Sequence, residues 1–93
     1  MNRKQILEEA EQCICRDRES EYGKPESNLG RIADFWNDYI GSRMEGNLHA
    51  EDVAVMMALL KVARIAAGTF KADSYIDAVG YLALAGEIAS GGN

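Results

Sequence analysis

Residues 50–89 read AEDVAVMMALLKVARIAAGTFKADSYIDAVGYLALAGEIA, and this stretch decides the fold. Up to residue 67 it is apolar nearly all round a helix, and Gly68 predicts where that helix ends. After a short link, residues 75–89 form a second apolar helix, with Asp73 or Ser74 as its expected N-cap. Because both helices are apolar on most of their circumference, other helices must cover them, and the sequence predicts an all-α domain.

Two amphipathic helices precede this pair. From Asn2 to about Arg18, apolar residues recur at helical spacing with glutamates between them. A second helix is expected from Glu26 to Ile40, with Pro25 in its first turn. The chain therefore reads as one four-helix domain over residues 1–89, followed by a flexible tail at residues 90–93.

The chain has 93 residues, and a domain of this size has a narrow stability margin. Two amphipathic helices cannot cover two helices that are apolar all round. We therefore expect a homodimer or a tetramer, formed mainly by the last two helices.

Charge and hydropathy exclude some partners. The net charge is −5, and the excess of acidic residues lies entirely in residues 1–52. The absence of a dense field of Lys and Arg argues against polymeric nucleic acid as a partner. The longest apolar run, residues 53–60, is far shorter than the roughly 20 residues that span a bilayer. We expect a cytoplasmic protein with no membrane partner.

Charged residues inside the apolar helices are the first candidates for a site, because a buried charge needs a partner. Lys61 and Arg64 share one face of their helix, and Asp73, Asp77 and Tyr81 form a row along the next helix. One interpretation is a buried salt bridge from Asp77 to Lys61 or Arg64. The other is a ligand site, where the cations bind phosphate or the two aspartates bind a hard cation such as Mg²⁺. Both can hold at once.

The connection between the first two helices is a second candidate. Arg18, Tyr22 and Lys24 supply cations and an aromatic face ahead of a helix N-terminus, which is a combination that can stack a base and bind phosphate. The alternative is an ordinary interhelical turn with Tyr22 packed on the core.

The remaining polar residues have simpler explanations. Asp34 and Asp38 are typical of a solvated helix face, and Glu51 and Asp52 complement a helix dipole. His49 reads as a polar residue that precedes a helix. The sequence has no phosphate-binding glycine loop, zinc motif or nucleophile elbow.

A resemblance to known proteins is carried by five segments, residues 22–28, 31–33, 51–57, 60–64 and 73–81. Together these segments resemble a small family of phage and prophage proteins. That family looks related to the nucleotide modification-associated domains and, more distantly, to the MazG-like all-α nucleotide pyrophosphatases.

The resemblance implies a nucleotide ligand. MazG-like enzymes hold Mg²⁺ against a triphosphate with a pair of glutamates on one helix and an acidic pair on the next. Asp73 and Asp77 match the second pair, but Lys61 and Arg64 occupy the segment of the first. This departure implies direct binding of phosphate without the metal.

The function expected from the resemblance is that of a phage counter-defence protein, which sequesters a nucleotide or a nucleotide-derived host immune signal without hydrolysing it. One alternative is a Mg²⁺-dependent nucleoside triphosphate pyrophosphatase, in which Asp34, Asp38, Glu51 or Asp52 replaces the missing glutamates. Another is a helical module that binds a protein.

Overall fold

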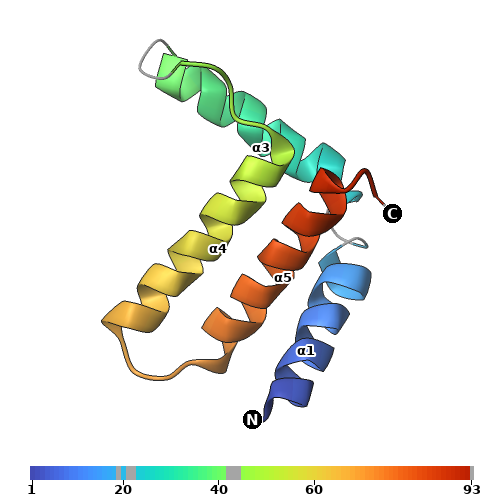
Figure 1. Ribbon diagram of the computed structural model, residues 1–93, viewed down its shortest axis with the longest axis vertical. Coiled ribbons are helices and arrows are strands. Elements are labelled where there is room, and N and C mark those ends of the chain that lie inside the picture. Colours follow the sequence, from blue (N-terminus) through green and yellow to red (C-terminus); the bar gives the residue numbers. More distant parts are fainter. Residues whose placement is uncertain (19, 21–22, 42–44, 93) are drawn as a thin grey trace.

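The structure is a computed structural model that describes residues 1–18, 20, 23–41 and 45–92 (Figure 1). These residues form four α-helices and one π-helical turn, with no strand among them, which confirms the predicted all-α fold with four helices. The elements are α1 (Arg3–Gln12), η1 (Cys13–Asp17), α3 (Pro25–Ile40), α4 (Ala50–Ala67) and α5 (Ala72–Ala89).

The helices α4 and α5 run antiparallel, and α1 lies along the other side of α5 (Figure 1). Helix α3 crosses the end of this layer where α4 begins and α5 ends. The hydrophobic core lies at this crossing and is formed by Leu29, Ala33, Val53, Ala54, Leu84 and Ala85. The opposite end of the layer, around Gly68, is therefore not covered by α3.

The start of α4 follows the prediction. His49 is the N-cap, and its backbone N–H donates to Asp52 Oδ2 at 2.9 Å. Glu51 and Asp52 lie in the first turn, where they complement the helix dipole. The Asn37 side chain exchanges two hydrogen bonds with the Leu48 backbone, which holds this helix start against α3.

The predicted N-cap of α5 is wrong. The helix begins at Ala72 with Lys71 as its N-cap, and the Ser74 N–H already donates to the Lys71 carbonyl at 3.2 Å. The backbone is therefore helical before Asp73 and Ser74 are reached, and both lie in the first turn.

The first helix does not continue as a regular α-helix to Arg18. It widens after Gln12 into η1, where the Arg18 N–H donates to the Cys13 carbonyl. This turn lies close against α5, because a Cβ added at Gly80 would be 2.9 Å from Ile14 Cγ2. Gly80 therefore allows η1 to approach α5 closely, because it has no side chain.

The end of α5 is closed by its own backbone. The Gly92 N–H donates to the Glu87 carbonyl at 2.8 Å and the Gly91 N–H to the Ile88 carbonyl at 3.1 Å. Gly91 has a φ of 85°, which a glycine adopts without strain, so residues 90–92 form a Schellman cap. Asn93 is outside the described residues, and a flexible tail stays a prediction.

One face of α4 is not covered within the chain. Five large apolar side chains of this helix are at least 40% exposed, whereas its inner face is buried against α3 and α5. They are Val55, Met56, Leu59, Leu60 and Val62. The sequence predicts that both sides of α4 are covered, but one chain covers only one of them. Among the described residues, no helix is long and apolar enough to cross a membrane.

Candidate functional site

The end of α4 and the start of α5 are joined by an ion pair. Lys61 Nζ lies 3.0 Å from Asp77 Oδ2, and the two side chains are 15% and 36% exposed. The sequence left open a salt bridge from Asp77 to Lys61 or to Arg64, and the structure has the one to Lys61. Because both groups are partly removed from water, we expect the pair to favour this register of α4 against α5.

A cavity of about 540 Å³ opens beside this ion pair. Three cations, two carboxylates and two hydroxyl groups line it, so its formal charge is +1 in a chain whose net charge is −5. The polar residues are Lys61, Arg64, Thr69, Lys71, Asp73, Ser74 and Asp77. Such a set offers N–H and O–H donors to an anion, and a guanidinium can hold a phosphate through two parallel hydrogen bonds.

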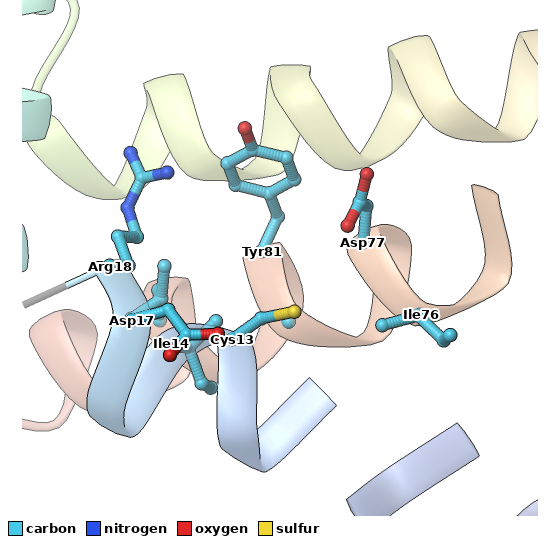
Figure 2. A pocket seen from close by; sticks show the side chains of 9 residues that line it. Cys13, Ile14, Asp17, Arg18, Ile76, Asp77 and Tyr81 are labelled. Carbon is cyan, nitrogen blue, oxygen red and sulfur yellow. The ribbon is translucent and has the colours of Figure 1, made fainter. Parts of the chain in front are cut away.

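A second cavity of about 280 Å³ lies between η1 and α5 (Figure 2). The side chains of Arg18, Tyr81 and Asp77 project from it in the same direction, toward α4. The Arg18 Cζ atom lies 5.5 Å from the centroid of the Tyr81 ring, within the range of a cation–π contact. Asp77 lines both cavities and so links an aromatic site to a cationic one.

The second cavity also contains a half-buried thiol. Partial burial raises the pKa of Cys13, and the carboxylates of Asp77 and Asp17 raise this pKa further. A raised pKa keeps the thiol protonated at neutral pH, which makes it a poor nucleophile. Cys13 therefore contributes a thiol of raised pKa to the wall of this cavity.

Other predicted site residues lie elsewhere. Lys24 is the exposed N-cap of α3 and lines a separate surface hollow with Ser27 and Arg31. The sequence grouped Lys24 with Arg18, but the structure places them at different sites. Tyr22 lies outside the described residues.

Four acidic residues were considered as replacements for the glutamate pair of MazG-like enzymes. None of them lines the cavity that contains Asp73 and Asp77. Asp34 and Asp38 are exposed on α3, and Glu51 and Asp52 lie at the far end of α4 from Gly68. Within the parts of the chain that the structure describes, no three His, Cys, Asp or Glu side chains come close enough to hold a metal. Asp77 Oδ2 is paired with Lys61, and a Mg²⁺ site formed by Asp73 and Asp77 stays a prediction.

Sequence reasoning missed part of both cavities. Lys71 and Thr69 were treated as a link between helices, but they line the cationic cavity. The sequence did offer a signal for Lys71, because it is a cation only two residues before Asp73. Cys13 and Asp17 had no such signal, because their place beside Tyr81 depends on the widened turn of η1.

The fold and cavities define a small all-α domain with a cation-lined hollow at a helix junction. The chain belongs to a family described as a domain of unknown function (DUF6378), which matches residues 5–89. It is 40% identical over 76 residues to the Gene 55 protein of Mycobacterium phage L5, covering 82% of this chain and 47% of that protein. The Gene 55 protein of Mycobacterium phage D29 is 37% identical over 76 residues, with 82% and 48% covered.

These relatives confirm the predicted resemblance to phage proteins. The chain spans about half the length of the curated relatives it matches. No solved structure gives a significant match. The relationship to MazG-like and nucleotide modification-associated proteins stays a prediction.

Proposed function

We propose that this protein binds a small nucleotide and does not hydrolyse it. The observation that carries the proposal is the grouping of Lys61, Arg64 and Lys71 around one cavity of an otherwise acidic chain. Burial of Lys61 in particular favours an anionic ligand, because an anion adds a second partner to a cation that is mostly removed from water.

The two cavities suit the two parts of a nucleotide. The phosphates occupy the hollow with Arg64 and Lys71, and the base lies against Tyr81 and Arg18, where an aromatic ring and a guanidinium plane can both stack on it. Asp77 lies between these positions and can accept a hydrogen bond from a ribose hydroxyl or a base amino group.

The same side chains support binding without turnover. Lys61 and Arg64 neutralise phosphate charge directly, but neither activates a water molecule as a bound metal does. Together with phage relatives, this supports a protein that sequesters a nucleotide or a nucleotide-derived host immune signal inside the infected cell. We further expect it to act as an oligomer, because α4 leaves large apolar side chains exposed.

A thermal-shift screen with mono-, tri- and cyclic nucleotides tests this proposal. We expect at least one nucleotide to raise the melting temperature in excess chelator, because ligands that bind only the folded state stabilise it. Release of pyrophosphate from triphosphates with Mg²⁺ is measured in parallel, and none is expected. Pyrophosphate release would favour the pyrophosphatase alternative, and no shift with any nucleotide would favour a protein-binding module.

A further inference from the structure

We infer that two copies of the chain pair along α4, with the two α4 helices antiparallel. The exposed face of α4 carries two adjacent apolar stripes, each with spacings of four, three and four residues. The first is Val55, Leu59, Val62 and Ala66, and the second is Met56, Leu60, Ala63 and Ala67. This spacing is the heptad pattern by which one helix inserts its side chains between those of another.

The chain as a whole exposes more surface than a compact monomer of its mass, as expected if a second copy covers part of it. The chain exposes 6601 Å², whereas a folded monomer of this mass exposes about 5,300 Å². The difference, about 1,300 Å², is larger than the roughly 800 Å² that each partner buries in a standard interface. The radius of gyration is 14.0 Å, compared with about 12 Å for a compact domain of this length, so the helices lie in an open arrangement.

The charges of α4 favour a second copy in antiparallel orientation. No charged residue lies between Asp52 and Lys61. The middle of the exposed face therefore suits the same uncharged segment of a second α4. The first turn carries Glu51 and Asp52, and the last turn carries the exposed Arg64, whereas Lys61 faces Asp77 of α5. Antiparallel pairing brings the acidic end of each helix to the basic end of the other, whereas parallel pairing brings like charges together.

This arrangement places the cationic cavity at the rim of the interface. Arg64 lines the cavity and is exposed on α4, one turn after the apolar seam at Leu60. In the antiparallel pair the start of the second α4 lies beside it. The inference does not depend on nucleotide binding, since it uses the apolar face and the charges at the helix ends.

Sedimentation velocity or light scattering at micromolar concentration tests the pairing. We expect a wild-type mass of about twice 10.2 kDa, or a tetramer built from such pairs. Leu59→Glu places a charge in the middle of the seam and should weaken self-association at least a hundred-fold. Leu59 is 60% exposed, so the substitution leaves the core intact, and circular dichroism verifies the helix content.

The matched control is Leu7→Glu on α1, because Leu7 is 58% exposed and lies outside the seam. This variant should associate as the wild type does. A wild-type monomer, or dissociation by Leu7→Glu and not by Leu59→Glu, would overturn the inference.

Charge reversal tests the orientation. In the antiparallel pair, Glu51→Arg and Arg64→Glu should each weaken association, and the double variant should recover it. In a parallel pair residue 64 meets residue 64 of the other copy, so Arg64→Glu replaces one pair of like charges by another and leaves association nearly unchanged. The second pattern would overturn the antiparallel assignment.

Discussion

The carboxylate of Asp77 has two roles, because it pairs with Lys61 at 3.0 Å and lines both cavities. The sequence predicted that Asp77 pairs with Lys61 or Arg64, since all three are charged residues inside apolar helices. It did not predict that the pair is only partly buried. The expected energy of the pair is therefore lower than that of a fully buried one.

Replacing Asp77 should destabilise the fold. Asp77→Asn leaves Lys61 without its counter-charge, and we expect a loss of about 1–3 kcal/mol in the free energy of unfolding, between the values for exposed and buried pairs. Urea unfolding followed by circular dichroism measures this loss. The control is Glu8→Gln, which breaks the exposed Lys4–Glu8 pair and should cost less than about 0.5 kcal/mol. Equal effects of the two variants would show that the pair does not fix the helix register.

Cys13 should react with thiol reagents more slowly than the exposed Cys15. Burial and the nearby Asp77 carboxylate raise the pKa of Cys13. At a given pH, the thiolate fraction of Cys13 is therefore smaller than that of a cysteine with the ordinary pKa. We expect Cys13 in a Cys15→Ser variant to alkylate with iodoacetamide more slowly than the exposed Cys15 in a Cys13→Ser variant. Adding Asp77→Asn should lower the pKa of Cys13 and shift its rate profile to lower pH. An unchanged profile would place Asp77 away from the thiol.

At the level of helices, turn and breaker residues predicted most of the fold. Gly68 ends α4 and Pro25 begins α3, as expected from their backbone preferences. The start of α5 was wrong because Asp73 and Ser74 are good N-caps by residue type, yet Lys71 already has the extended backbone that precedes a helix. The π-helical turn η1 could not be predicted, because local spacing does not distinguish it from an α-helix.

Gly80 should be intolerant of a side chain. A methyl group there would meet Ile14 Cγ2 at 2.9 Å, so Gly80→Ala must push η1 away from α5, at a cost of about 1–3 kcal/mol. The matched control is Gly30→Ala on α3, where an added Cβ meets nothing within 4 Å. That variant should gain up to about 1 kcal/mol from better helix propensity. Thermal melting measures whether each variant is less or more stable than the wild type. A Gly80→Ala protein as stable as Gly30→Ala would contradict the close packing.

Over the whole chain, the candidate site was only partly predictable. The row of Asp73, Asp77 and Tyr81 and the pair Lys61 and Arg64 were found because polar residues are rare in these helices. Arg18 was assigned to a different group, with Lys24, because the sequence did not show that η1 lies beside α5.

The link between the two cavities gives a test of ligand orientation. Tyr81→Leu should weaken nucleotide binding about ten-fold by removing a stacking partner of the base, and it should leave inorganic pyrophosphate binding unchanged. Tyr75→Leu is the control, because Tyr75 lies on the same helix against Phe70 and outside both cavities. Calorimetric titration separates these cases. Equal loss of nucleotide and pyrophosphate binding would show that Tyr81 supports the cavity and does not contact the base.

The most direct test is titration calorimetry of the best-stabilising nucleotide in excess EDTA at low and high salt. Metal-free binding through Lys61 and Arg64 predicts that affinity persists in EDTA and falls as salt rises, because the contacts join cations to an anion. Arg64→Glu should abolish this binding, whereas Arg3→Glu, the same charge reversal at an exposed position on α1, should not. Loss of wild-type binding in EDTA, or retention of full affinity by Arg64→Glu, would contradict direct phosphate recognition by these cations.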